Sequence, residues 1–269
     1  MEEIKVQVNL KTQQDEIADA MKGIKVKIVV LSGKGGVGKS TVASNLALAF
    51  AKKYPGKVGI ADLDFSGPNI AKMLGVEGKR IETTDDSKFL PVVGPKDLKI
   101  VSMAFFLETA STPVVWRGPL KIKALRQFLT DFIWGPLDVL IFDMPPGTGD
   151  EAISVMQMIP DLDGIVIVTT PQQVSVLDTG KSLVMSEKMD QKVLGIIENM
   201  ASFKCPSCKT EHAIFGEGGG MKMAEEFNTL LLGQIPLDPL IREKEDRGLT
   251  DSFEYFDPIV KKISDLIKK

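Results

Sequence analysis

The sequence predicts an α/β fold in which a doubly wound, mainly parallel β-sheet is flanked by helices. Six short runs are apolar at consecutive positions, which is typical of strands that are covered on both faces. Helical patterns lie between these runs, and strand–helix alternation over this length favours a doubly wound sheet. A glycine-rich stretch follows the first run directly and opens the first helical pattern.

The six expected strands are rich in β-branched residues, and they cover residues 27–32, 57–64, 98–103, 138–144, 164–170 and 193–200. The helical patterns between and after them cover residues 39–53, 119–134, 174–189 and 257–269. In the first pattern, Val42, Leu46 and Phe50 fall on one face, which we expect to pack on the sheet. Residues 79–97 are rich in Thr, Asp and Pro and are expected to form a loop.

The chain shows no internal repeat and no obvious linker. We therefore expect residues 25–269 to form one domain, with a cysteine-containing metal loop at 201–212, and residues 1–24 to form a partly helical appendage. A chain of 269 residues can bury a substantial core without disulfide or metal staples.

Composition limits the class of partner and the compartment. The net charge is −3 and the sequence pI is about 5.4, which argues against a nucleic-acid-binding face. No apolar run approaches the roughly 18 residues of a membrane span. The charged N-terminus has no apolar core of a secretory signal, and the chain has two cysteines only three positions apart. We therefore expect the protein in the reducing cytoplasm, with no membrane or nucleic-acid partner.

The glycine-rich stretch fits the phosphate-binding pattern G-x-x-x-x-G-K-[ST]. Its glycines let successive backbone N–H groups face phosphate oxygens, and the following helix adds its positive end. Lys39 should reach the β- and γ-phosphates, and the Ser40 hydroxyl should bind Mg²⁺. The expected nucleotide-binding residues of this loop are Gly33, Lys34, Gly35, Gly36, Val37, Gly38, Lys39, Ser40 and Thr41.

Carboxylates follow two of the expected strands. Asp143 ends an apolar run, where a P-loop protein holds Mg²⁺ directly or through water; the alternative is an Asp that only caps the next element. Asp62 and Asp64 end the second run, and we expect only one of them to face the nucleotide. Asp64 is the stronger candidate for orienting or deprotonating the attacking water, although both could simply begin a turn.

Lys34 is a second lysine in a loop that already holds Lys39, and the two cations repel each other unless extra negative charge is present. A triphosphate supplies that charge, and a second lysine would neutralise charge that develops at the γ-phosphate. A lysine this early in the loop could reach the nucleotide of a second copy across a two-fold axis. The alternative is a lysine that faces solvent.

The stretch "GKGGVGKST" resembles the deviant Walker A motif of the MinD/ParA/nitrogenase-iron-protein group of ATPases, in which the extra lysine acts in trans within an ATP-sandwich dimer. Further stretches narrow the resemblance to the Mrp or ApbC type of iron–sulfur cluster carrier ATPase. They are "DLDFSGPNIAKMLGV", "PVVWRGPL", "DMPPGTGDEAISVMQ", "TTPQQVSVLD", "ENMASFKCPSC" and "IFGEGGG", in the order of the family, over roughly residues 25–248.

The resemblance implies a slow ATPase that binds an iron–sulfur cluster and transfers it to apoproteins, with cluster scaffold proteins as further partners. It assigns Lys34 as the trans lysine, Asp64 and Asp143 as the aspartates of two nucleotide-sensing switches, and Asn199 as the residue that contacts adenine. An amide suits that task because it offers both a donor and an acceptor to the base edge. The alternative is a turn-forming asparagine after a strand.

The "CPSC" stretch places Cys205 and Cys208 at a spacing that lets two thiolates hold one metal centre. Two thiolates make only half of a four-thiolate site, and the sequence has no other cysteine. A homodimer would supply four thiolates around one axis, enough for a bridging [4Fe–4S] cluster, and the same axis would suit Lys34. The alternatives are a bridging zinc ion, a zinc site completed by His212, and a redox dithiol.

The last residues, "DPIVKKISDLIKK", predict an amphipathic helix with lysines opposite its apolar face. Such a helix can lie on a membrane, but it has no Phe or Trp to anchor it there, so we expect it to pack on the protein. The rival function is a MinD/ParA-like positioning ATPase with a structural zinc site. The cysteine pair discriminates between the two functions, because a positioning ATPase does not need it.

Overall fold

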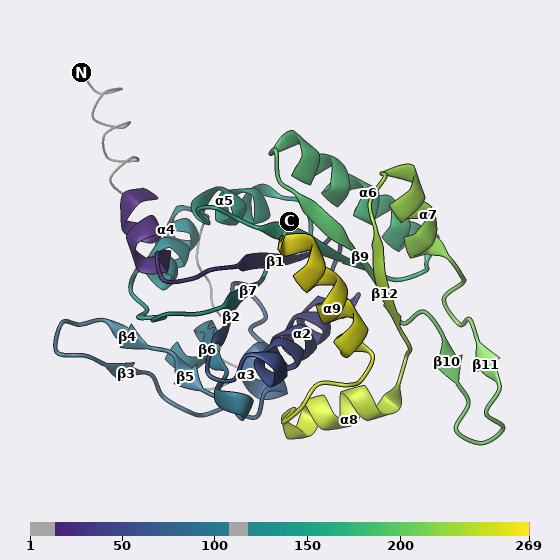
Figure 1. Ribbon diagram of the computed structural model, residues 1–269, viewed down its shortest axis with the longest axis horizontal. Helices are drawn as coiled ribbons and strands as arrows, with labels where there is room; N and C mark the ends of the chain where they lie inside the picture. Colours follow the sequence, from purple (N-terminus) through teal and green to yellow (C-terminus); the bar gives the residue numbers. More distant parts are fainter. Residues whose placement is uncertain (1–13, 108–117, 269) are drawn as a thin grey trace.

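The computed structural model describes residues 14–107 and 118–268, and its centre is an eight-stranded sheet (Figure 1). The sheet order is β12-β9-β8-β1-β7-β2-β6-β5, and all neighbouring pairs are parallel except β5 and β6. The strands are β1 (Lys27–Ser32), β2 (Val58–Asp62), β5 (Val92–Val93), β6 (Lys99–Ser102), β7 (Val139–Asp143), β8 (Gly164–Thr169), β9 (Val193–Asn199) and β12 (Leu231–Ile235). The predicted doubly wound α/β fold is confirmed.

Helices cover both faces of the sheet. They are α2 (Lys39–Lys53), α3 (Ile70–Met73), α4 (Gly118–Thr130), α5 (Asp150–Met158), α6 (Gln173–Lys188), α7 (Gly219–Glu226), α8 (Pro239–Arg247) and α9 (Phe256–Ile267). One hydrophobic cluster joins one face of the sheet to α2, α3, α8 and α9, and a second joins the other face to α4, α5, α6 and α7. Side chains of β1 alternate between them: Ile28 and Val30 belong to the first cluster, and Val29 and Leu31 to the second. Burial on both faces explains why the strand is apolar at consecutive positions.

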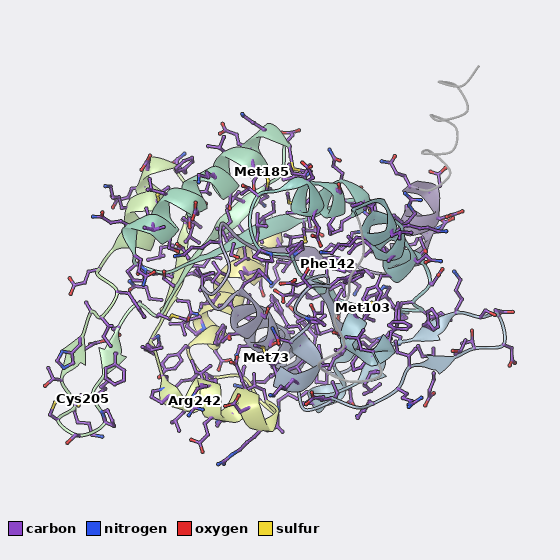
Figure 2. All side chains as sticks on the ribbon, turned by 180° about the vertical axis from the view of Figure 1, so that it is seen from behind. Met73, Met103, Phe142, Met185, Cys205 and Arg242 are labelled. Carbon is purple, nitrogen blue, oxygen red and sulfur yellow. The ribbon has the colours of Figure 1, made fainter. Side chains whose placement is uncertain are left out.

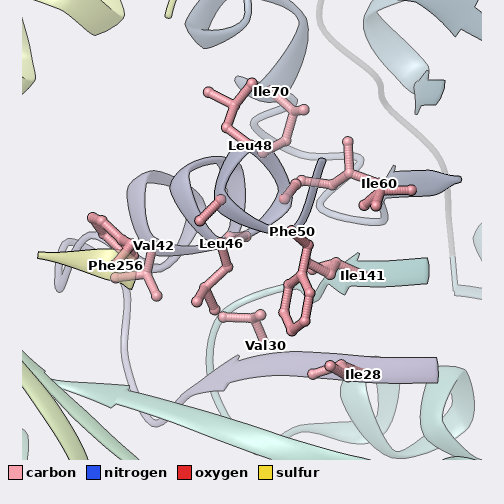
Figure 3. Packing of buried hydrophobic residues seen from close by; sticks show 14 of the residues in the cluster. Ile28, Val30, Val42, Leu46, Leu48, Phe50, Ile60, Ile70, Ile141 and Phe256 are labelled. Carbon is pink, nitrogen blue, oxygen red and sulfur yellow. The ribbon is translucent and has the colours of Figure 1, made fainter. Parts of the chain in front are cut away.

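Helix α2 is buried on nearly all sides rather than along one stripe. Its Leu46 and Phe50 point toward the strands as predicted (Figure 3). Ala43, Ala47 and Leu48 are also fully buried, because α3 and α9 cover the outer face of the helix. The buried surface of α2 is therefore wider than the predicted apolar face. Its small alanines let neighbouring helices approach closely.

The last helix, α9, packs on the protein as expected. Ile259, Val260 and Ile263 are buried, and α9 contacts α2 and β12. In the part of the chain that the structure describes, no helix is long and apolar enough to cross a membrane. Residues 14–21 form a further helix, and its Ile17 and Met21 are buried in the core.

Two regions differ from the expectation. Strand β12 was not predicted, because its sequence, Leu-Leu-Gly-Gln-Ile, has only one β-branched residue and it lies at the edge of the sheet. The expected loop at 79–97 contains a short hairpin of β3 (Glu82–Thr83) and β4 (Phe89–Leu90), followed by β5. These strands have two residues each, too few for a period-two pattern to be visible.

Candidate functional site

The carboxyl ends of the parallel strands lie at one edge of the sheet, and the candidate residues gather there. The phosphate loop follows β1, Asp62 ends β2, Asp143 ends β7 and Asn199 ends β9. Asp62 and Asp143 occupy the same level of the neighbouring strands β2 and β7. This edge is where open α/β sheets bind ligands.

The loop between β1 and α2 depends on glycine at three positions. Gly36 and Gly38 have φ values of +81° and +82°, in the left-handed region that favours glycine. Gly33 lies against the backbone of α6, and a Cβ there would come within 2.2 Å of the Asp178 carbonyl oxygen. Helix α2 begins at Lys39, directly after Gly38. The loop therefore has the tight turn that a phosphate cradle requires.

Asp143 joins the two polar side chains at the start of α2. Its Oδ1 lies 2.7 Å from the Lys39 ammonium, and Ser40 Oγ donates to its Oδ2 at 2.6 Å. Lys39 and Asp143 are both buried, so their charges interact through a medium that screens them poorly. The hydroxyl and carboxylate oxygens of Ser40 and Asp143 are hard ligands of the kind that Mg²⁺ prefers, and the donor set fits that ion.

Asp62 and Asp64 occupy different environments. Asp62 is fully buried, accepts a hydrogen bond from Ser102 Oγ at 2.9 Å and receives the Ile70 N–H at 3.3 Å. Burial and the neighbouring Asp143 charge raise the pKa of Asp62 to about 8. Burial raises the pKa of Asp143 as well, and the Lys39 charge and the hydrogen bonds from Lys39 and Ser40 oppose that rise. Asp64 lies beyond the strand and is half-buried, and it is the carboxylate with freedom to face a ligand.

Lys34 is half-buried, and Ser32 Oγ donates to its backbone carbonyl at 3.0 Å. Among the described residues, its ammonium forms no salt bridge. Asn199 is buried and contacts the phosphate loop. Its Nδ2 donates to the Val37 carbonyl at 2.9 Å and would lie 2.1 Å from a Cβ on Gly38.

Glu245 of α8 contacts the start of α2, and the sequence did not predict this contact. Its Oε2 accepts a hydrogen bond from Thr41 Oγ1 at 3.1 Å, so α8 touches the helix that follows the phosphate loop. Burial raises the pKa of Glu245 to about 7. The sequence carries no signal for this contact, since Glu245 is one of several charged residues in α8.

We expect Glu245→Gln to change how stability depends on pH. The folded protein binds the Glu245 proton more tightly than the unfolded chain does, because the folded pKa is about 7 and the usual value is 4.5. The stability that this tighter proton binding contributes is therefore fully present below the unfolded pKa and is lost as the pH rises through the folded pKa. Relative to the native protein, the variant should gain a few degrees in Tm between about pH 5 and pH 8.

Thermal melting across this pH range measures the effect. Glu243→Gln, on the same helix, is the matched control, because Glu243 pairs with Arg247 at the surface. If the Tm difference between Glu245→Gln and the native protein were the same at about pH 5 and at about pH 8, the raised pKa of Glu245 would be contradicted.

The cysteines lie at the tip of a hairpin formed by β10 (Phe203–Lys204) and β11 (Glu211–His212), which projects from the body of the protein (Figures 1 and 2). Cys205 N–H donates to the Thr210 carbonyl at 2.9 Å, and Lys209 N–H donates to the Cys205 carbonyl at 2.9 Å. Cys205 is half-buried and Cys208 is exposed. Within the described residues, no three His, Cys, Asp or Glu side chains are grouped so that they could hold a metal ion.

Thr210 favours the thiolate form of Cys208. The two side chains lie 3.3 Å apart, and hydrogen bonding with Thr210 and Cys205 lowers the pKa of Cys208 to about 7. Thiolate is the form that binds metal. We expect Thr210→Val to raise this pKa and to slow alkylation of Cys208 at pH 7 by about threefold or more.

Mass spectrometry of the labelled peptides separates Cys208 from Cys205 and gives each rate as a function of pH. Ser207→Ala, in the same turn, controls for a change in hairpin structure. An unaltered pH profile in Thr210→Val would show that Thr210 does not set the thiolate fraction.

An open cavity of about 790 Å³ lies between the hairpin and the segment that follows β12. Cys205 lines it on one side, and Asp238, Leu240 and Tyr255 line it on the other. The base of the hairpin is tied to the same segment, since Leu237 N–H donates to the Ser202 carbonyl at 2.7 Å. Residues 108–117, which hold most of "PVVWRGPL", lie outside the described residues.

Comparison with known proteins identifies relatives over most of the chain. An iron–sulfur cluster carrier protein of Saccharolobus solfataricus is 54% identical over 241 residues, which cover 90% of this chain and 79% of the relative. A protein of the same name from Methanocaldococcus jannaschii is 48% identical over 266 residues, covering 96% and 91%.

Solved structures of other proteins also resemble this chain. A nucleotide-binding protein from Archaeoglobus fulgidus, in complex with ADP and with cobalt, is 37% identical with a TM-score of 0.78, covering 90% of this chain and 96% of that one. The cell division ATPase MinD of Pyrococcus furiosus is 22% identical with a TM-score of 0.64, covering 90% and 99%, which shows a shared fold. The family model of the NUBPL iron-transfer P-loop NTPases matches residues 23–269. The chain therefore belongs to the NUBPL iron-transfer P-loop NTPases.

Proposed function

We propose that this protein binds and slowly hydrolyses ATP and carries a [4Fe–4S] cluster, which two copies hold between them and deliver to apoproteins. The observation that carries the proposal is the cysteine hairpin. It presents the chain's two cysteines at an accessible tip, and one chain supplies half of the four thiolates that such a cluster needs. The second half would come from the same hairpin of a second copy.

The nucleotide half of the proposal rests on the loop between β1 and α2. Its backbone and Lys39 would hold the phosphates, and Ser40 and Asp143 would hold Mg²⁺, which neutralises charge on the phosphate oxygens when bound. In this structure the Lys39 ammonium pairs with the Asp143 carboxylate. When nucleotide binds, the ammonium would exchange this carboxylate for a phosphate. Asp64 would orient the attacking water, Lys34 would act on the nucleotide of the second copy, and Asn199 would contact the adenine.

The names of the relatives support an iron–sulfur cluster as the cargo. The names of those from S. solfataricus and M. jannaschii state that they carry iron–sulfur clusters, and the A. fulgidus structure contains ADP. The partners of this chain would accordingly be scaffold proteins that supply clusters and apoproteins that receive them. The rival function, a positioning ATPase with zinc between the cysteines, predicts a protein that cannot donate a cluster.

A transfer assay tests the proposal. The reconstituted protein is mixed anaerobically with the apo form of a [4Fe–4S] enzyme, and recovery of that enzyme's activity is followed with a chelator present to trap free iron. We expect activity to recover with the chelator present. Recovery that disappears with the chelator would mean that iron leaves through solution and that this protein is not a carrier.

A further inference from the structure

Lys121, near the start of α4, joins two segments that come from different strands. Its ammonium donates to Ser66 Oγ at 2.9 Å and to the Glu151 carboxylate at 2.7 Å. The Lys121 side chain is 16% exposed and that of Glu151 is 29% exposed. A half-buried pair with two partners is screened less by water than an ordinary surface salt bridge.

The two partners lie close in sequence to the two candidate carboxylates. Ser66 is two residues beyond Asp64, in the segment that leaves β2. Glu151 lies in the first turn of α5, just after the Pro-Pro-Gly-Thr-Gly loop that leaves β7 at Asp143. One ammonium therefore links the two segments through which a bound γ-phosphate would be sensed.

Strand β1, which leads into the phosphate loop, also contacts the second of these segments. The Gly147 N–H donates to the Ser32 carbonyl at 2.9 Å, and Met144 N–H donates to the Val30 carbonyl at 3.2 Å. The segment after Asp143 is thus fixed to β1 at its beginning and to Lys121 at its end. In the segment after Asp64, Phe65 is buried and packs on Phe128 of α4 with ring centroids 5.1 Å apart, whereas Ser66 is exposed. Leu63 N–H donates to the Asp143 carbonyl at 2.9 Å, and Lys121 adds a side-chain link farther along the two segments.

We propose that Lys121 is a positioning residue for ATP hydrolysis: it holds the segments that carry Asp64 and Asp143 in one arrangement and touches neither carboxylate. The proposal rests on the proposed ATPase function. Phosphoryl transfer depends mainly on positioning and charge, so a small displacement of Asp64 lowers turnover while the phosphate loop still binds nucleotide. The effect should therefore appear in kcat and not in KM.

The test compares Lys121→Met with Lys123→Met in the full-length protein. Lys123 lies on the same helix and is exposed, so it controls for loss of a lysine from α4. We expect Lys121→Met to lower kcat about tenfold with KM for ATP within about twofold, and Lys123→Met to match the native protein. Lys121→Arg should recover part of the loss, since it keeps a cation that can reach both partners.

A double-mutant cycle with Glu151→Gln separates positioning from a general loss of structure. Because the two residues would act as one unit, the double variant should lower kcat no further than either single variant. An unchanged or raised kcat in Lys121→Met, or losses that multiply in the double variant, would overturn the inference and leave the proposed function standing. A native protein that does not hydrolyse ATP would overturn both.

Discussion

Lys34→Ala should abolish ATP hydrolysis and leave ATP binding largely intact. Lys34 has no salt-bridge partner among the described residues, whereas Lys39, Ser40 and Asp143 form a contact set of their own. The variant therefore keeps the groups that would bind phosphate and Mg²⁺. Removing a cation that stabilises charge only in the transition state should lower kcat about 10³-fold or more.

Hydrolysis rates and equilibrium nucleotide binding are measured on the same preparations. Lys72→Ala, an exposed lysine of α3, is the control and should behave as the native protein does. Turnover that survives in Lys34→Ala would remove Lys34 from the mechanism.

Mixing two inactive variants tests whether Lys34 acts across a dimer. Lys39→Ala cannot hold its own phosphates but still offers Lys34, whereas Lys34→Ala holds nucleotide but lacks the lysine. If the lysine acts in trans, mixed dimers contain one complete site and activity returns on mixing. Failure to complement, with mixed dimers shown to form, would place Lys34 at its own nucleotide.

Cys205→Ala and Cys208→Ala should each lose the cluster completely while retaining the nucleotide site. Either change reduces the four thiolates of a dimer to two, too few for a [4Fe–4S] centre. The hairpin lies apart from the contacts of Lys39 and Asp143, so ATP affinity should remain within about twofold.

Iron and sulfide content after anaerobic reconstitution, together with nucleotide binding, measures both parts of this prediction. Ser207→Ala keeps both thiols in the same turn and should hold as much iron as the native protein. Either cysteine variant with full iron and sulfide would refute the assignment of the cluster to this hairpin.

The phosphate loop and the cysteine hairpin are joined through Asn199 and the few residues that follow it. Asn199 ends β9 in contact with Val37 of the phosphate loop, and the hairpin strand β10 begins four residues later at Phe203. The intervening Met200 has a φ value of +57°, so the chain turns sharply between them. A change in the loop on nucleotide binding would reach Cys205 through the Asn199–Val37 hydrogen bond and the short stretch of chain after Asn199.

Patterns that are local in sequence predicted most of the framework. The apolar runs gave β1 with its observed bounds, because both faces of that strand are buried. The glycine spacing located the phosphate loop, because the φ values at Gly36 and Gly38 lie in the region that favours glycine. Strand β12 was missed because it lies at the sheet edge, where a strand needs fewer β-branched residues.

Contacts between distant segments could not be predicted. Thr41 and Glu245 are 204 positions apart, and Asn199 and Val37 are 162 positions apart. Nothing in the local pattern around Lys121 distinguishes it from Lys123, yet only Lys121 is turned toward Ser66 and Glu151 in the described structure. Such contacts depend on how distant elements pack, as α4 packs with α5 at Lys121, and the sequence pattern does not specify that packing.

The most direct test of the central claim is the metal content of the native dimer after anaerobic reconstitution with iron and sulfide, read with the visible absorption spectrum. The account predicts about four irons and four sulfides per dimer and a broad charge-transfer band. One tightly bound zinc per dimer, with neither sulfide nor the band, would contradict it. The hairpin would then be a structural clasp, and the positioning ATPase would become the better description of the protein.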